Sequence, residues 1–114
     1  MNQQCIFCRI IAGEVPAEIV GQSDGAIAIR DRNPQAPSHI LVIPRRHAAT
    51  LAEYVGQAKP EEVGSAFSMA SKLGRDANPA GYRVVVNEGR DGGQTVDHVH
   101  IHVLAGRPMH WPPG

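Results

Sequence analysis

Apolar residues follow a helical period in one long stretch of the chain. Between residues 60 and 77 they recur every three or four positions, which is the spacing of one buried helical face. These residues are Val63, Ala66, Phe67, Ala70, Leu73 and Ala77. Because Pro60 suits a first helical turn and Asn78-Pro79 stops a helix, the pattern predicts one main helix over residues 60–77.

Shorter stretches predict five β-strands. They cover residues 17–22, 26–30, 39–43, 82–87 and 98–104. The apolar, β-branched run 39–43 predicts a central strand, and residues 6–11 predict a brief helix or turn. Two prolines within residues 31–38 predict a loop. Together these elements predict a single α+β domain that spans residues 1–114.

Charge and composition exclude several classes of protein. The 114 residues carry 11 Lys and Arg against 11 Asp and Glu, so the cationic surplus of a nucleic-acid binder is missing. No apolar run approaches the ~20 residues that span a bilayer, and no secretory signal is evident. We therefore expect a cytoplasmic protein that binds neither nucleic acid nor membrane.

Three histidines alternate with apolar residues in the last predicted strand. Alternate side chains of a strand share a face, so His98, His100 and His102 would lie on one side and the residues between them would be buried on the other. Three imidazoles spaced in this way diverge too far to share one metal ion. We expect them to have different roles rather than to form an ordinary solvated face.

Residues 89–95 form a glycine-rich loop before this strand. Its glycines let the backbone approach a ligand, and successive amide groups in such a turn can bind an anion. Both a plain turn and a cradle for one phosphate fit the loop. It lacks the P-loop pattern, so polyphosphate chemistry with magnesium is not implied.

Cys5 and Cys8 form a Cys-x-x-Cys pair near the N-terminus. Two thiolates leave a tetrahedral zinc ion two ligands short, and His47 and His98 would complete it, with His39 as the rival of His47. A redox role would place the motif in a βαβ unit, which the pattern does not supply. A closed site of this kind would be structural.

His-x-His-x-His followed by two apolar residues resembles the motif of the histidine-triad superfamily of nucleotide hydrolases and transferases. Residues 98–104 match this motif in full. Further segments are similar to the Hint branch of the superfamily. They are residues 5–8, 31–44, 85–89, 91–94 and 109–114.

This resemblance implies a fold and an activity. The fold would be a five-stranded antiparallel sheet with one main helix and a short N-terminal helix, paired in a homodimer into a ten-stranded sheet. Hint-like proteins hydrolyse nucleoside 5′-phosphoramidates, in which AMP or GMP is joined to an amine, without a catalytic metal. Residues 105–114 would contact the partner subunit, with Trp111 beside its active site; as the alternative, Trp111 covers a hydrophobic patch.

Residue roles are implied position by position. His100 would be the nucleophile that forms a nucleotidyl-histidine, with His102 and His39 beside it. An imidazole attacks only through an unprotonated nitrogen, so its other nitrogen should donate to a main-chain acceptor. The α-phosphate would contact Asn87, Gly93, Gln94, Thr95, His100 and His102. The nucleoside pocket would be formed by Ile6, Phe7, Ile10, Ile29 and Asp31.

The chain departs from the family pattern at a few positions. Thr95 replaces the usual Ser and keeps its hydroxyl, and Asp97 replaces an aromatic residue. Arg30 and Arg32 stand where those proteins have His and Ile. These two differences change the contacts expected in the base pocket and, with them, the expected preference for purines.

The Cys-x-x-Cys pair is similar to that of zinc-carrying, mostly bacterial members, which favours a structural zinc held by Cys5, Cys8, His47 and His98. Two other functions remain open. Hydrolysis of dinucleoside polyphosphates is one, although the Trp-Pro-Pro-Gly ending counts against it. The other is a nucleotide-sensing module with incidental hydrolysis.

Overall fold

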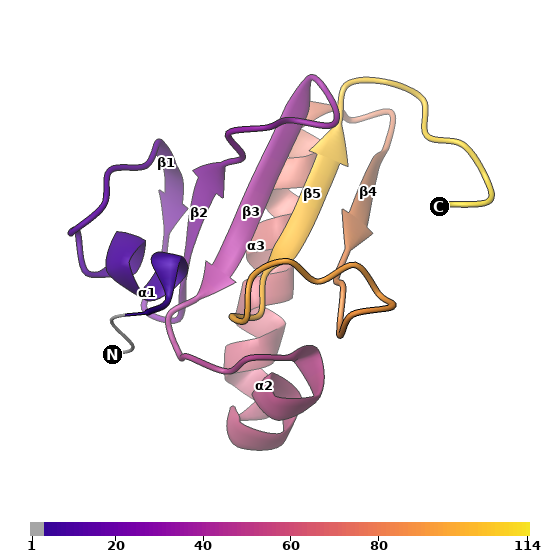
Figure 1. The fold of residues 1–114 in the computed structure, drawn as a ribbon. Coiled ribbons are helices and arrows are strands. Elements are labelled where there is room, and N and C mark those ends of the chain that lie inside the picture. The colour runs from indigo at the N-terminus through magenta and orange to yellow at the C-terminus, as the bar shows by residue number, and fades with distance from the viewer. Residues whose placement is uncertain (1–3) are drawn as a thin grey trace.

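The computed structural model describes residues 4–114, which form an α+β structure with one sheet (Figure 1). The strands of the described residues are β1 (Ile19–Gln22), β2 (Ala26–Arg30), β3 (Ser38–Pro44), β4 (Tyr82–Val85) and β5 (Ile101–Ala105). Their helices are α1 (Ile6–Ile11), α2 (Leu51–Gln57) and α3 (Pro60–Ala77). All neighbouring strands are antiparallel in the order β1-β2-β3-β5-β4, so β3 is the central strand, as predicted.

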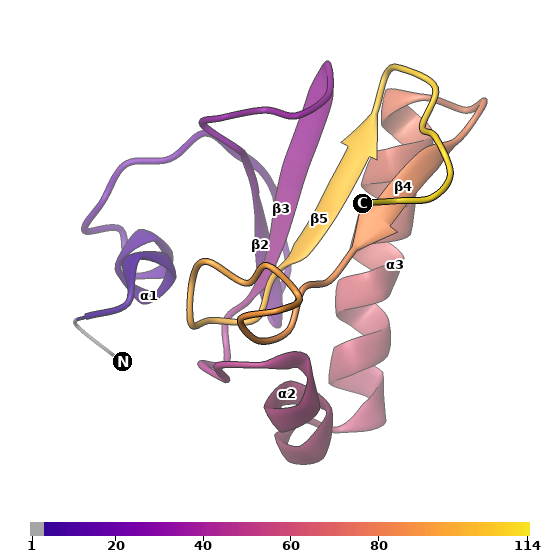
Figure 2. The same cartoon turned by 45° about the vertical axis from the view of Figure 1, so that its right-hand side comes forward.

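The two faces of the sheet are covered by different helices (Figure 2). Side chains of β2 and β3 alternate between the faces, as the pleat of a strand requires. Ala28 and Val42 pack in one cluster with Ala70 of α3, whereas Ile29 and Leu41 pack in another with residues of α1. The rings of His98 and His100 lie on the α1 face, because Phe7 of α1 contacts both of them.

Helix α3 has the predicted bounds, but its buried face differs from the predicted one. Ala66, Ala70 and Gly74 are buried in α3, whereas Phe67 is exposed. Small residues allow α3 to approach the sheet closely. A Cβ atom at Gly74 would overlap the ring of Tyr82 on β4, so a larger residue would force the helix or the ring to move.

Helix α2 was missed, although the sequence carries a signal for its start. The Thr50 hydroxyl accepts a hydrogen bond from the Glu53 amide at 3.2 Å, which is the first half of a capping box. The Glu88 carboxylate accepts from the Ala52 amide at 2.9 Å and so ties the loop after β4 to this helix. The Thr-x-x-Glu spacing in the sequence predicts this cap.

The last strand begins three residues later than predicted, at Ile101 rather than at residue 98. His98 and His100 therefore precede the ladder of the sheet. The predicted alternation still holds, because the residues between the histidines are buried away from α1. No helix among residues 4–114 combines the length and apolar character needed to cross a bilayer.

Candidate active site

A pocket of about 610 Å³ opens between α1, the ends of β2 and β5, and the segment before β5. His100 and His102 line one part of it, together with Thr95. The five residues predicted for a nucleoside also line it: Ile6, Phe7, Ile10, Ile29 and Asp31. The pocket has the size of a small-molecule site, with apolar walls and a few polar groups, and it brings the two predicted sets of residues together.

The His100 ring has a defined tautomer. Its Nδ1–H donates to the main-chain carbonyl of His98 at 2.8 Å, which leaves Nε2 unprotonated in the neutral ring. A main-chain acceptor for this ring is what the sequence predicted. The ring is buried and packs edge-on against Phe7 at 5.1 Å between ring centroids. An unprotonated nitrogen on a ring held in this way is suited to nucleophilic attack.

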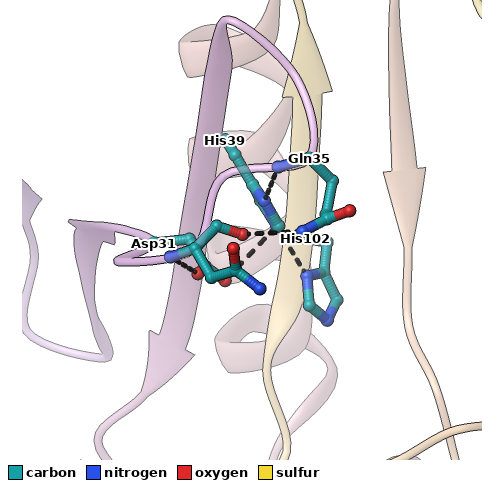
Figure 3. Close-up of polar contacts among 5 residues, drawn as sticks. Asp31, Gln35, His39 and His102 are labelled. Carbon is teal, nitrogen blue, oxygen red and sulfur yellow. Dashed lines mark hydrogen bonds and ion pairs between the residues drawn. The ribbon is translucent and has the colours of Figure 1, made fainter.

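His39 and His102 form a hydrogen-bonded pair, which we call the histidine pair (Figure 3). The Gln35 amide donates to His39 Nδ1 at 3.0 Å, so a neutral His39 carries its proton on Nε2. That proton is donated to His102 Nδ1 at 2.9 Å. His102 Nδ1 is therefore an acceptor, and the remaining proton of a neutral His102 lies on Nε2.

Burial keeps both rings of the histidine pair neutral. Desolvation above all, together with the neighbouring rings of His100 and His39, lowers the pKa of His102 to about 4, against a smaller opposite effect of Asp31. Desolvation also lowers the pKa of His39, although the Asp31 carboxylate 3.5 Å from His39 Nε2 opposes this shift. At neutral pH the pair thus consists of two neutral rings with ordered protons.

The glycine-rich loop contributes less to the pocket than predicted. Thr95 lines the pocket, but Asn87, Gly93 and Gln94 do not. The side-chain amide of Gln94 donates to the carbonyls of Ala49 and Val96. Its main-chain N–H donates to the carbonyl of Gly89. The Gly93 amide donates to Arg90 at 3.1 Å. In this structure the donors of Gly93 and Gln94 therefore hold the loop itself.

Two cysteines and two histidines come together beside α1. They are Cys5, Cys8, His47 and His98, and we call this group the thiol cluster. Cys5 Sγ lies 3.3 Å from His98 Nδ1, and Cys8 Sγ lies 3.2 Å from His47 Nδ1. The two Nδ1 atoms are 3.1 Å apart, and all four ligand atoms lie within 4.8 Å of one another. Ligand atoms around one tetrahedral zinc are separated by roughly 3.3–3.8 Å. The spacing and the donor types fit zinc.

The main chain also prepares His98 to bind a metal. Its Nε2–H donates to the Pro44 carbonyl at 2.7 Å, which leaves the Nδ1 lone pair facing the thiols. Desolvation lowers the pKa of His98, so the ring is neutral. His47 and not its rival His39 completes the group, because His39 lies in the histidine pair.

Asp31 and the histidine pair also bring three potential ligand atoms together. However, the Gln35 amide requires an acceptor at His39 Nδ1, which places the proton on Nε2, the atom that would have to bind the metal. A metal there would force two donors to face each other. This group does not fit a metal.

Some pocket residues, Leu41 and Glu18 among them, carried no recognisable signal in the sequence. Leu41 lines the pocket because it is opposite His102 in the β3–β5 ladder, which only the strand register shows. Glu18 and Arg30 also line the pocket and form an ion pair at 2.8 Å.

Trp111, predicted to contact a partner subunit, is 83% exposed.

Comparisons with known proteins point to one family. The model of the HIT domain family matches residues 12–109. A HIT-like protein of Synechococcus elongatus is 43% identical over 114 residues and is matched over the full length of both chains. The crystal structure of a HIT family hydrolase from Legionella pneumophila is 43% identical, with a TM-score of 0.90, over 96% of this chain and 99% of that chain.

The names of two further similar proteins mention zinc. A 14 kDa zinc-binding protein of Zea mays is 42% identical over 115 residues, covering 96% of this chain and 87% of the relative. A zinc-bound histidine triad family protein from Mycobacterium smegmatis is 30% identical, with a TM-score of 0.80, over 90% of this chain and 75% of that chain.

Proposed function

The chain belongs to the HIT domain family, and on this premise we propose that it hydrolyses the P–N bond of purine nucleoside 5′-phosphoramidates through a nucleotidyl-histidine at His100. The observation that carries the proposal is the His100 ring, whose Nδ1–H is bonded to a carbonyl while Nε2 is unprotonated beside the pocket. The HIT family hydrolase from Legionella pneumophila supports a hydrolytic reaction.

The pocket suits a nucleoside monophosphate group. Ile6, Ile10 and Ile29 offer apolar contact area for a base, and the Asp31 carboxylate offers acceptors for ribose hydroxyls. The phosphate would then lie against Thr95 and the two histidines. Of the predicted phosphate contacts, Asn87, Gly93 and Gln94 would require a change in the loop to reach it.

The reaction has two steps. His100 Nε2 forms a bond to phosphorus while the P–N bond breaks, and the amine departs with a proton from solvent. Water then attacks the nucleotidyl-histidine, releases the nucleoside monophosphate and restores the neutral ring. Two displacements through a histidine replace one direct attack by water.

His102 acts in this scheme as a hydrogen-bond donor to a phosphoryl oxygen. Its Nε2–H is fixed by the chain of donors from Gln35 through His39. If His102 gave this proton to the amine and took another from His39, a buried imidazolate would remain on His39. The histidine pair therefore orients the Nε2–H donor of His102 and does not supply the proton of the amine. The hydrogen bond from this donor becomes stronger as negative charge develops on the phosphoryl group.

The thiol cluster holds a structural zinc in this proposal. Cys5, Cys8, His47 and His98 fill all four tetrahedral positions, so bound zinc would supply stability and no site for substrate. The zinc-binding relatives from Zea mays and Mycobacterium smegmatis support this assignment.

We extend the proposal to a homodimer built on β4. This strand is at the edge of the sheet, and Val84 on it is exposed, as is Phe67 on α3. An unpaired edge strand next to exposed apolar residues is suited to pairing with a second copy. The tail with Trp111 would then reach the partner subunit. We place this homodimer in the cytoplasm.

Turnover of adenosine 5′-phosphoramidate tests the proposal. His100→Ala should lose activity by about 10⁴-fold or more, because the nucleophile is absent, while AMP binding remains. Retained turnover in His100→Ala would contradict the nucleophile assignment. Preferred hydrolysis of diadenosine polyphosphates by the wild type, or AMP binding without turnover, would favour one of the two other functions.

A further inference from the structure

The His98 residue joins the thiol cluster to the nucleophile. Its Nδ1 lies in the cluster, 3.3 Å from Cys5 Sγ, and its Nε2–H is bonded to Pro44. Its main-chain carbonyl accepts the Nδ1–H of His100 at 2.8 Å. The atom that fixes the tautomer of the nucleophile therefore belongs to a residue whose own ring is a ligand of the cluster.

No sheet pairing holds this segment in place. Strand β5 begins at Ile101, so His98 and His100 precede its ladder. Besides the ring contacts, the segment is held by the Val99 amide, which donates at 2.8 Å to the carbonyl of Ala48, and by the Val99 side chain, which is buried against Ala48 and Tyr54. These contacts hold Val99, whereas the contacts of His98 itself are those of its ring in the thiol cluster and with Pro44, so the thiol cluster is one of the supports of the His98 carbonyl.

Phe7 makes a second link through α1. Its ring packs edge-on against His98 at 5.9 Å and against His100 at 5.1 Å, so it separates the cluster from the pocket. Helix α1 has six residues and begins at its cap, Cys5, whose Sγ accepts from the Cys8 amide at 3.3 Å. A helix this short has little stability of its own, so its position depends on its buried contacts, to which both cysteines contribute together with Phe7 and Ile10.

We propose that metal binding at the thiol cluster positions the nucleophile, with His98 as the positioning residue and Phe7 as a second contact. Zinc bound to His98 Nδ1 would fix the peptide whose carbonyl holds His100 in the attacking tautomer, and zinc bound to Cys5 and Cys8 would fix the wall of the pocket. The inference rests on the proposed function of His100 and adds that the metal site controls it.

His47→Ala provides the test, because His47 neither belongs to α1 nor lines the pocket and, unlike His98, does not supply the carbonyl that holds His100. We expect the variant to lose its zinc and to form the nucleotidyl-histidine about 10- to 100-fold more slowly, with a smaller loss of AMP affinity. Nitrogen-15 NMR at one fixed neutral pH should show the His100 ring changing from one tautomer to a mixture. His47→Cys is the matched control, since a third thiolate restores four ligands and should restore zinc, rate and tautomer.

Demetallation of the wild type by a chelator, followed by addition of zinc sulfate, repeats the comparison without a substitution. Melting temperatures establish that each sample is folded. A folded, zinc-free protein that keeps a single His100 tautomer and an unchanged rate would overturn the coupling, as would a wild type that binds no zinc. Failure of the proposed function is distinguishable, because zinc-loaded wild type would then form no nucleotidyl-histidine while its NMR spectrum still reports the tautomer.

Discussion

The thiol cluster and the histidine pair contain the same side chain in opposite chemical roles. In the thiol cluster, the Pro44 carbonyl accepts a hydrogen bond from His98 Nε2–H and so leaves Nδ1 free to bind a metal. In the histidine pair, the Gln35 amide occupies His39 Nδ1 and leaves a proton on Nε2. A single main-chain atom next to each ring, a carbonyl or an amide, decides whether that ring can bind a metal or donates a proton.

Of the changes that distinguish the histidine pair from the thiol cluster, replacing His39 should have the largest effect on activity. His39→Ala removes the donor to His102 Nδ1, so the proton of His102 is no longer held on the nitrogen proposed to face the phosphate. We expect kcat to fall on the order of 100-fold, while the zinc content stays at that of the wild type. Steady-state kinetics and elemental analysis on the same sample measure both. Loss of zinc would instead make His39 a metal ligand, which contradicts the comparison.

Changing the main-chain atom itself gives a sharper and smaller effect. Gln35→Pro removes the amide that donates to His39 Nδ1, whereas Gln35→Ala keeps it. We expect kcat to fall about 10-fold in Gln35→Pro and to change less than about twofold in Gln35→Ala, because only the former frees the tautomer of His39. The two melting temperatures control for damage to the loop. Equal activities of the two variants would show that this amide does not set the role of His39.

Acid pH should reveal the neutral state of the histidine pair through stability. The folded pKa of His102 is about 4, whereas an exposed imidazole has a pKa of about 6.5. Between these values the unfolded chain binds a proton that the folded protein does not, so the free energy of unfolding falls as the pH is lowered through this range. Allowing for partial solvent screening, this loss is about 1 kcal/mol between pH 7 and 5.5.

Urea unfolding of the wild type and of His102→Asn at both pH values isolates this contribution. The loss should be smaller in the variant, since the other groups that titrate in this range are common to both proteins. A variant with the same pH dependence as the wild type would show that His102 is protonated as readily in the folded state as in the unfolded chain.

Elements with a local cause were predictable from the sequence. The period of apolar residues and the flanking prolines gave α3 its observed bounds, and the hydrophobic run 39–43 indicated a central strand. The buried face of α3 was only partly correct, because Phe67 belongs to its exposed side. Whether a helical side chain is covered depends on the neighbouring element, which the helical period does not contain.

Most residues of the candidate site and the main-chain partner of His100 were predictable, but the proton positions of His98 and of the histidine pair were not. Residue types and a family resemblance indicated the four proposed metal ligands, which lie together in the structure, and the five residues proposed for a nucleoside, which line one pocket. The tautomers depend on the carbonyl of Pro44 and the amide of Gln35, which reach the rings only after β3 and its preceding loop have folded. Main-chain groups carry no residue signature, so a sequence pattern does not reveal them.

Trapping the covalent intermediate tests the central claim most directly. Wild-type protein in excess would be mixed with adenosine 5′-phosphoramidate, quenched with base within one turnover, digested and analysed by mass spectrometry. The account predicts AMP attached to His100, and no adduct in His100→Ala. AMP attached to His39 or His102, or turnover by His100→Ala at the wild-type rate, would contradict it.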